Sequence, residues 1–394
     1  MTRSVDVDVD VLIVGAGPSG LVAAIRLLER GLTVEIVDAA PHQAEESRAA
    51  LMHAATVEIL AGMGLASQLL SRGQRIDAIT LADGARPLAR ITLGELDTPY
   101  PFALGIPQDV TEAILVGRLA ELGLRVTRGI HIETVTQDTG RCRVEGRRTA
   151  DDEPWTGVAR YVVGADGKNS TVREQAGIPY DGAPYEDDFI LADVELAPPP
   201  SRDTEARIGF SPEGVTVIGR LPSGRYRIVA SVPREPEAPR HPDRSYLDRL
   251  LASRGIPTST AGEPVWSSRF RISHHVARRF RAGPIVLCGD AAHVHSPAAG
   301  QGMNTGIADA YELADRIASA ASGDVTALDA YDRIRRRAAA EVVRLTDRIT
   351  RVALVRSRTL RATRDAVIPV VAGIPPVGRG IARAVSGLGR SPLH

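Results

Sequence analysis

The sequence predicts an α/β protein in which a nucleotide-binding domain is interleaved with a second, mainly antiparallel sheet. Residues 9–38 have the pattern of a strand, a tight glycine turn, a helix and a second strand. Residues 186–232 alternate as the strands of an antiparallel sheet do. The length of 394 residues exceeds one ordinary core and suits two domains of different size.

Composition argues against several classes of function. The 48 basic and 48 acidic side chains cancel, so no charge excess favours nucleic acid or an anionic membrane. Cys142 and Cys288 are far apart and belong to no Cys/His cluster, which argues against a disulfide framework or a metal site and fits a reducing cytoplasm. No stretch approaches about 18 uninterrupted apolar residues, and the N-terminus lacks the pattern of a signal peptide. We therefore expect a cytoplasmic protein without a transmembrane helix.

The first strand and helix frame a glycine loop of the dinucleotide-binding type. The loop GAGPSG supplies the candidate cofactor-binding residues Gly15, Gly17, Pro18, Ser19 and Gly20. Its glycines permit a tight turn and the close approach of a pyrophosphate, which the N-terminus of the following helix would attract. Asp38 ends the second strand, where a carboxylate can accept hydrogen bonds from an adenosine ribose and would repel a 2′-phosphate. This Rossmann-type pattern does not distinguish FAD from NAD.

The remaining elements follow from the same patterns. We expect a helical stretch over 43–72, strands with a turn at Asp83 over 75–97, and a helix over 111–123. A buried strand is expected over 284–290, a long helix over 303–321, and a mostly helical chain beyond 327. The predicted nucleotide-binding domain is discontinuous and comprises residues 1–75, 98–180 and 280–345. The inserted sheet domain comprises residues 76–97 and 181–279. A C-terminal helical segment covers residues 346–394.

Three further segments narrow the nature of the nucleotide. Residues 161–174 are YVVGADGKNSTVRE, residues 289–310 are GDAAHVHSPAAGQGMNTGIADA, and residues 107–115 are PQDVTEAIL. In order and spacing they resemble the flavoprotein aromatic hydroxylases, which are FAD-dependent monooxygenases similar to para-hydroxybenzoate hydroxylase. The resemblance covers the whole chain and implies a Rossmann-type FAD-binding domain with an inserted substrate-binding sheet.

The resemblance also implies the chemistry. A non-covalently bound FAD would be reduced by NADPH or NADH, which visits transiently, and would react with O2 to give a C4a-hydroperoxide that hydroxylates an aromatic ring. No residue stands out as an anchor for a carboxylate. A neutral polycyclic phenol or quinone, as in antibiotic biosynthesis, is therefore the first expectation for the substrate, and a small phenolic acid is the second. We expect a monomer or a homodimer.

The segment 289–310 has the features of a socket for the flavin. Asp290 follows a buried strand, where its carboxylate could accept hydrogen bonds from the ribityl hydroxyls. Small side chains beyond it would let the flat ring stack closely, and amides at the start of the next helix would face the ring edge. The candidate residues of this segment are Gly289, Asp290, Pro297, Gly300, Gly302, Met303 and Asn304, with Pro297 counted among the catalytic candidates.

Four further cofactor contacts rest on the resemblance. Arg48 would reach the pyrophosphate, and Asp166 and Gly167 would lie near it, with a suggested part in NAD(P)H binding. Gln108 would contact the flavin or the adenosine. The structural alternatives are a solvated arginine, an ordinary Asp-Gly turn and a helix-cap aspartate at Asp290.

Two positions depart from the family pattern. Ala55 stands where the family often has an arginine, so phosphate contacts differ or depend on Arg48 alone. Ala299 stands where a second glycine is common, which affects the closest approach of the ring.

Three histidines are candidates for proton transfer or structure. His295 is expected near the flavin ring and is the catalytic candidate among the three. His293 is expected to hydrogen-bond backbone, and His53 lies in a segment that the resemblance places beside the flavin, without an assigned role.

The inserted sheet is expected to form the roof of the substrate pocket. Along residues 225–230, side chains alternate between two faces, and the sequence does not settle which face looks at the flavin. The candidate substrate contacts are Phe210, Val217, Tyr226 and Ile228.

Rival functions exist on the same fold. A flavin halogenase usually has a paired-tryptophan segment, whereas Trp155 and Trp266 stand alone here. A flavin reductase is a second rival. A non-catalytic binding protein is a third, although such a protein would have no need for an intact ring-edge segment. The C-terminal helices could cap the pocket or mediate dimer contacts.

Overall fold

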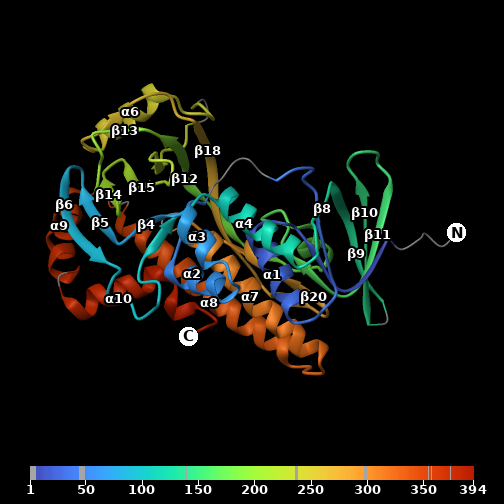
Figure 1. Ribbon diagram of the computed structural model, residues 1–394. Coiled ribbons are helices and arrows are strands. Elements are labelled where there is room, and N and C mark those ends of the chain that lie inside the picture. Colours follow the sequence, from blue (N-terminus) through green and yellow to red (C-terminus); the bar gives the residue numbers. More distant parts are fainter. Residues whose placement is uncertain are drawn as a thin grey trace.

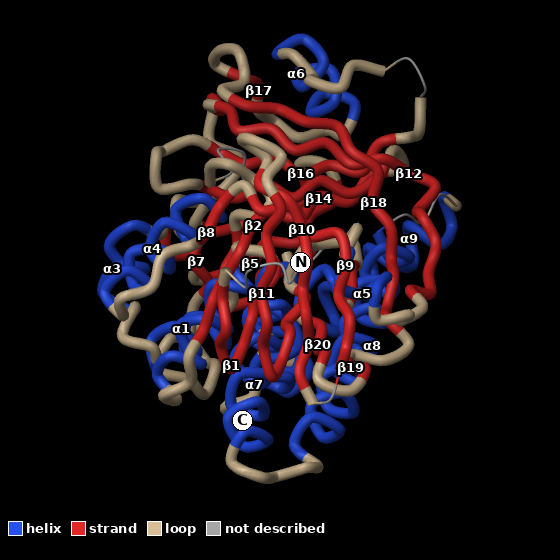
Figure 2. The backbone as a smooth tube through the Cα atoms, turned by 90° about the vertical axis from the view of Figure 1, so that its right-hand side faces the viewer, coloured by secondary structure: helices blue, strands red, loops and turns tan. Residues whose placement is uncertain are grey.

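The computed structural model describes residues 6–43, 49–138, 140–235, 238–296, 300–353, 355, 357–372 and 374–394. Two large sheets occupy opposite sides of the molecule, with helices packed around and between them (Figure 1, Figure 2). The predicted α/β class is confirmed.

The first sheet is built around three parallel strands. β1 (Val7–Val14) lies between β2 (Val34–Asp38) and β11 (Pro154–Gly164) and pairs with both in parallel. β11 pairs in parallel with β20 (Ile285–Leu287), and β2 with β8 (Thr127–Arg128). The antiparallel strands at its margins are β9 (Ile130–Asp138), β10 (Arg141–Arg148) and β19 (Arg281–Ala282). The carboxyl ends of β1, β2, β11 and β20 therefore meet at one edge, where ligands bind in open parallel sheets.

Helices cover this sheet because each presents an apolar stripe to it. α1 (Pro18–Glu29) starts directly after the glycine turn and packs on α4 (Gln108–Glu121) and α7 (Gln301–Ala321). α8 (Ala327–Ala353) packs on α7, and the short α5 (Thr171–Gln175) follows β11. The inward side chains of β1 and α1 are fully buried, as Leu12, Ile13, Leu21 and Ile25 show.

The second sheet is mostly antiparallel. Its strands, in spatial order, are β21 (His293–Val294), β18 (Trp266–Ala277), β12 (Tyr180–Val194), β16 (Tyr226–Val232), β15 (Gly214–Arg220), β14 (Glu205–Ser211), β5 (Ala78–Asp83) and β6 (Arg86–Thr92). α6 (Arg244–Ser253) covers its outer face, where Leu247 and Leu251 bury Ile190 and Ile228. β21 belongs to the range predicted for the first domain, yet it pairs with β18. The segment 280–345 therefore contributes to both sheets.

Smaller elements connect the two sheets. β3 (Leu51–Met52), β7 (Ala103–Gly105) and β4 (Gln74–Ile76) form one small sheet, and β13 (Leu196–Ala197) pairs with β17 (Ser259–Thr260). The C-terminal helices α9 (Arg358–Ala372) and α10 (Pro375–Ser386) pack on β6 (Figure 1). η1 (Gly289–Ala291) and η3 (Leu388–Arg390) are single 3₁₀ turns.

The predicted helical stretch over 43–72 is partly wrong. Within it, the structure has β3, then α2 (Ala54–Gly62) and α3 (Ala66–Arg72), and residues 44–48 lie outside the described part. The helix is interrupted because Gly64 takes a φ of +79°, a left-handed conformation that ends a helix.

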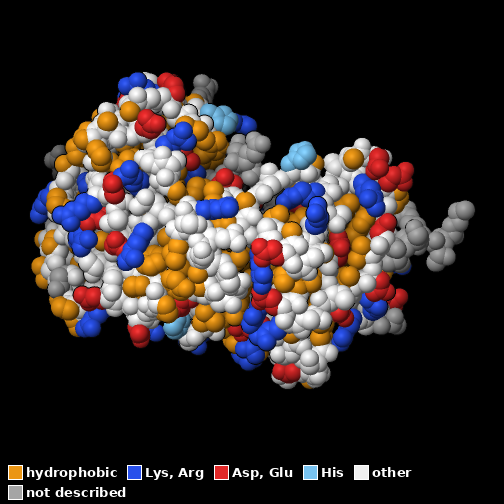
Figure 3. All heavy atoms as spheres, viewed as in Figure 1, with side chains coloured by type: hydrophobic (Ala, Val, Ile, Leu, Met, Phe, Trp, Pro, Cys, Tyr) orange, Lys and Arg blue, Asp and Glu red, His pale blue; other side chains and the backbone are white. Residues whose placement is uncertain are grey.

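The surface carries mixed charge. Figure 3 shows basic and acidic side chains interspersed over the viewed face, as the zero net charge of the chain leads one to expect. Among the described residues no single helix is long and apolar enough to cross a membrane. Thr359–Ala372 and Pro375–Ser386 meet the length and composition criteria only as a pair bent by 99°.

Candidate active site

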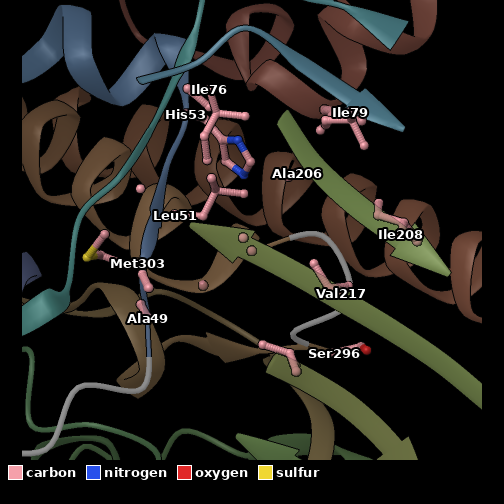
Figure 4. Close-up of a pocket in the computed structure, with 18 of the residues that line it drawn as sticks. Ala49, Leu51, His53, Ile76, Ile79, Ala206, Ile208, Val217, Ser296 and Met303 are labelled. Atoms are coloured by element: carbon pink, nitrogen blue, oxygen red, sulfur yellow. The ribbon is translucent and has the colours of Figure 1, made fainter. Parts of the chain in front are cut away.

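A cavity of about 950 Å³ lies where the carboxyl ends of β1 and β11 meet the second sheet. One side is lined by the loops after these strands, including Gly17 and Ala165, and the other by β15 and β16 with Val217 and Val229. Figure 4 shows Ala49 and Met303 on one side of the cavity and Ala206 and Ile208 on the other. The cavity thus joins a nucleotide-type edge to the inserted sheet.

The glycine turn is built for close backbone approach. Gly15 has a φ of +103°, and a Cβ there would overlap the carbonyl of Ala165. A Cβ on Gly20 would overlap the carbonyl oxygen of Gly15, so α1 can start only where no side chain stands. The remaining turn candidates Gly17, Pro18 and Ser19 line the cavity.

Asp38 is fixed at the mouth of this turn. Its Oδ2 accepts from the amide of Ala16 at 2.6 Å, and its Oδ1 accepts from the amide of Ala40 at 2.8 Å. The carboxylate is therefore oriented by backbone donors at the end of β2, the place where the ribose of a bound dinucleotide would lie.

The turn after β20 presents Asp290 to the cavity. Gly289 has a φ of +60°, and a Cβ there would overlap the hydroxyl of Ser19, so this turn packs directly on the glycine loop. Asp290 is exposed and lines the cavity, and its backbone carbonyl accepts from the hydroxyl of Tyr180 at 2.8 Å. At this position the carboxylate of Asp290 could accept hydrogen bonds from hydroxyl groups of a ligand.

The two residues of the Asp166-Gly167 turn have different surroundings. Gly167 lines the cavity. Asp166 is absent from the lining: its Oδ2 accepts from the amide of Val172 at 3.1 Å at the start of α5, and burial raises its pKa. The carboxylate of Asp166 thus accepts from the first turn of α5, whose N-cap is Ser170, and a cofactor contact by the Asp166 side chain stays a prediction.

The loop before α7 depends on glycine. Gly300 has a φ of +59°, and a Cβ there would lie 3.1 Å from Cδ2 of Leu51 on β3. Gly300, Gly302 and Met303 line the cavity as predicted residues of a ring-edge segment. Pro297 and Ala299 lie outside the described residues, as does Arg48.

Asn304 holds this loop in place from behind. It does not line the cavity; its Oδ1 accepts from the amide of His53 at 2.8 Å. Its Nδ2 donates to the carbonyls of Leu51 at 2.8 Å and Gly300 at 2.7 Å. The side chain of Asn304 thus ties α7 to β3 and α2, whereas the sequence pattern pointed only to its amide.

Gln108 begins α4 and lines the cavity. Its Nε2 donates to Oε1 of Glu112 at 2.9 Å. Burial raises the pKa of Glu112, while the hydrogen bond from Gln108 acts in the opposite direction. The amide of Gln108 is therefore oriented by its own helix.

His293 and His295 have different environments. Nε2 of His293 lies 2.5 Å from Oδ2 of Asp309, whose Oδ1 accepts from Nε of Arg335 at 2.6 Å. All three side chains are buried, and although burial opposes the charge of Asp309, Arg335 and His293 hold its pKa below the usual value. His293 was predicted to hydrogen-bond backbone, whereas in the structure its ring pairs with the side chain of Asp309. Asp309 and Arg335 were not predicted. An acidic residue at a position on the apolar face of the expected helix could have indicated that Asp309 has a buried partner.

His295 lines the cavity and stacks on His293, with ring centroids 6.0 Å apart and an interplanar angle of 9°. Burial, and then the neighbouring His293, lower its pKa to about 4. Its imidazole is therefore neutral at neutral pH, and its part in proton transfer stays a prediction.

The substrate-facing side of β16 differs from the prediction. Tyr226 and Ile228 point away from the cavity into the core under α6, and the prediction of both as substrate contacts is wrong. Side chains alternate along a strand, so the cavity face carries Arg227 and Val229 instead. The other two candidates, Phe210 and Val217, do line the cavity.

The C-terminal helices complete the far wall with residues that were not predicted individually. The lining side chains from α8, α9 and α10 are Leu345, Arg348, Ile349, Ile368, Ile381, Ala384, Val385 and Ser386. The amphipathic periodicity of this region is visible in the sequence, but the surface that its apolar stripe covers is not.

The cavity wall that the second sheet forms is largely apolar, and two arginines on it are paired with acids. Nε of Arg227 donates to Oδ1 of Asp193 and Nη2 to Oδ2, both at 2.7 Å, and Arg220 forms an ion pair with Asp203. The cavity therefore suits a bulky, mostly uncharged ligand.

Comparison with known proteins assigns the fold to a family. A family model described as an FAD binding domain matches residues 8–346. The chain belongs to this FAD-binding family. The match covers the glycine turn, Asp290 and the loop before α7, which are the features that a large, flat, phosphate-bearing cofactor requires.

The relatives of this FAD-binding protein include monooxygenases. It is 37% identical over 393 residues to a 6-methylpretetramide 4-monooxygenase of Streptomyces rimosus, covering 98% of this chain and 67% of the relative. The chain thus spans about two thirds of the length of that relative. Its structure is similar to that of OxyS anhydrotetracycline hydroxylase from Streptomyces rimosus, with a TM-score of 0.79 and 28% identity over 97% of this chain and 76% of the other. The fold also matches p-nitrophenol 4-monooxygenase PnpA from Pseudomonas putida DLL-E4, with a TM-score of 0.85 and 24% identity over 96% and 99% of the two chains.

These findings identify an FAD-dependent monooxygenase of the aromatic hydroxylase family, as the sequence predicted. The residues present fit FAD: the side-chain-free turn at Gly15 and Gly20 admits a pyrophosphate, and Asp38 is oriented for a ribose. Asp290 lines the cavity with a carboxylate that could accept from polyol hydroxyls, and Gly300 and Gly302 add no side chain that would block a ring.

Proposed function

We propose that this protein hydroxylates a neutral polycyclic phenol or quinone, using NADPH or NADH as electron donor and O2 as the source of oxygen. The observation that carries the proposal is the cavity of about 950 Å³, whose far walls are apolar and whose arginines on β15 and β16 are paired. The flavin would take part of that volume, and the remainder would still exceed the needs of a single small ring. The relatives named for tetracycline-type substrates support the same class.

The chain would hold the cofactor and order the reactants. The glycine turn and Asp38 would bind the adenosine half, and Asp290 the ribityl hydroxyls. The backbone at Gly302 and Met303 would face the edge of the ring at the positive end of α7. The chemistry supplied by bound FAD would be acceptance of hydride from NADPH or NADH and activation of O2 as the flavin C4a-hydroperoxide.

The substrate would occupy the space between this edge and the second sheet. Phe210, Val217 and Val229 offer apolar contact area there, and Ile368 and Val385 close the far wall. Their common task is to exclude water, since water would compete with the ring for the activated oxygen.

The test is oxidation of NADPH and NADH by the purified protein with a panel of polycyclic and simple phenols, followed by product mass. We expect a yellow protein with non-covalent FAD and a product heavier by one oxygen atom. A chloride-dependent product would indicate a halogenase, and NAD(P)H oxidation without a modified product a reductase. A colourless protein that takes up no FAD would overturn the assignment, as expected of a non-catalytic binding protein.

A further inference from the structure

The outer face of α9 is apolar although it is exposed. Five of the ten exposed large apolar side chains in the described part of the chain lie in this helix or just beyond it. They are Leu360, Val367, Val370, Val371 and Ile374, which are 37–67% exposed and are called the α9 stripe below. Their spacing places them on one side of the helix. A surface helix ordinarily has polar side chains on its outer face, so the α9 stripe is a surface that a partner would cover.

The inner face of the same region belongs to the cavity wall. Ile368 of α9 and Ile381 and Val385 of α10 line the cavity. Arg364 of α9 lies over the ring of Phe210, 4.9 Å from its centroid, and so contacts the second sheet. Figure 1 shows both helices at the margin of the molecule beside β6. One layer of helix with apolar side chains on both faces therefore separates this part of the cavity from the surroundings.

The two helices are also basic. Within α9 and α10 the sequence has five arginines, no lysine and one acid, Asp365. The ion pairs of the two helices are those of Arg364 with Asp83 and Asp365, so the exposed Arg379 and Arg383 have no acidic partner within the described residues. Figure 3 shows basic and apolar side chains together along this margin. The zero net charge of the whole chain thus conceals a local excess of positive charge.

We propose that the α9 stripe, together with Arg379 and Arg383, binds the surface of an anionic phospholipid bilayer. Apolar side chains on one face of a helix enter the boundary between head groups and acyl chains, and nearby arginines are attracted by lipid phosphates. The bilayer would cover the α9 stripe and lie against the outer side of the cavity wall. This inference goes beyond the proposed hydroxylation and does not depend on it.

Two other occupants fit this surface less well. A second copy related by two-fold symmetry would bring the unpaired arginines of both copies to one interface, where like charges repel each other. Interfaces between proteins are anchored mainly by aromatic side chains, and α9 and α10 contain no Phe, Trp or Tyr. An anionic bilayer offers both hydrocarbon for the α9 stripe and phosphate for the arginines.

The test is co-sedimentation of the FAD-loaded protein with vesicles of phosphatidylcholine alone or mixed with an equal part of phosphatidylglycerol. We expect about tenfold tighter binding to the anionic vesicles, and the difference should shrink as salt is added. Val370→Asp puts a charge into the α9 stripe and should weaken binding to the anionic vesicles about tenfold. Arg379→Gln combined with Arg383→Gln should reduce the preference for anionic vesicles and leave binding to neutral vesicles unchanged.

Val325→Asp is the matched control. Val325 is 85% exposed and lies between α7 and α8, away from the α9 stripe, so its substitution should leave vesicle binding unchanged. FAD occupancy and the unfolding temperature of each variant report whether the fold is kept. Absence of binding to anionic vesicles, or an equal loss in Val325→Asp and Val370→Asp, would overturn the proposal. A dimer in sedimentation velocity that Val370→Asp dissociates, without vesicle binding, would overturn it in favour of a second copy.

Discussion

The carboxylate of Asp309 on α7 lies 2.5 Å from Nε2 of His293 on β21, and neither side chain is more than 1% exposed. The same carboxylate accepts from Nε of Arg335 on α8 at 2.6 Å, and Nη1 of Arg335 donates to the carbonyl of Arg390 at 3.0 Å. One acid on α7 therefore links β21 of the second sheet to α8 and, through Arg335, to the C-terminal turn at Arg390.

Asp309→Asn should destabilise the protein strongly. The substitution removes the charge that compensates the buried guanidinium of Arg335, and breaking such a buried pair costs about 3–5 kcal/mol. The measurement is urea unfolding of the FAD-loaded protein at neutral pH. Asp315→Asn on the same helix is the matched control, because its ion pairs with Arg26 and Arg30 are partly exposed and should be worth about 1 kcal/mol or less. Equal losses in the two variants would contradict this account.

Stability should fall as the pH is lowered through the window set by His295. Its pKa is about 4 in the folded protein and 6.5 ordinarily, so between these values the unfolded chain binds more protons than the folded one. The free energy of unfolding should therefore decrease from pH 6.5 towards pH 4, by about 1–3 kcal/mol for this group. Urea unfolding of His295→Asn should show a smaller decrease over the same window. The variant His131→Asn, at an exposed position, should behave as the wild type, and a wild-type slope in both variants would argue against a His295 that stays neutral in the folded protein.

Asp290→Ala should weaken FAD retention while the fold is kept. The carboxylate faces the cavity, but its backbone carbonyl, which accepts from Tyr180, remains in the variant. FAD occupancy after gel filtration and the circular dichroism spectrum measure the two effects. Asp97→Ala, an exposed acid outside the cavity lining, is the control, and unchanged occupancy in Asp290→Ala would remove this residue from the site.

Gly300→Ala should impair both FAD binding and stability. The new Cβ would meet Leu51 in a backbone conformation of φ +59°, at a cost of about 1–3 kcal/mol. Gly62→Ala is the matched control, since nothing lies within 4 Å of its added carbon. Thermal unfolding measures the stability of both variants, and FAD titration measures their affinity for the cofactor. Equal values in Gly300→Ala and Gly62→Ala would show that the loop accommodates the added carbon.

The two faces of the second sheet can be told apart by a pair of substitutions. Val217→Phe on the cavity side should weaken binding of 2-hydroxyanthraquinone by filling the space, with little effect on FAD. Ile228→Val under α6 should leave that affinity unchanged and lower the free energy of unfolding by about 0.5–1.5 kcal/mol. The reverse pattern would place Ile228 in the pocket after all.

The sequence predicted those parts of the site in which local spacing carries the geometry. Gly15, Gly20 and Asp38 are positioned by one strand–turn–helix–strand unit, and the turn at Gly289 by the strand before it. The face of β16 was not predictable because both faces carry apolar side chains: Ile228 packs under α6, and Val229 lines the cavity. The contacts of Asp309 with His293 and Arg335 were also not predictable, because they depend on how α7 and α8 pack together and not on the periodicity of either helix.

The far wall of the cavity comes from α8, α9 and α10, which do not contribute to the glycine turn or to the loop before α7. The residues predicted to bind the cofactor and the residues of this wall thus come from different stretches of the chain, which meet where Nε2 of Gln301 donates to the carbonyl of Val385 at 3.0 Å. Divergence, or a directed library confined to residues 345–386, could change which molecule is accepted without disturbing the redox centre.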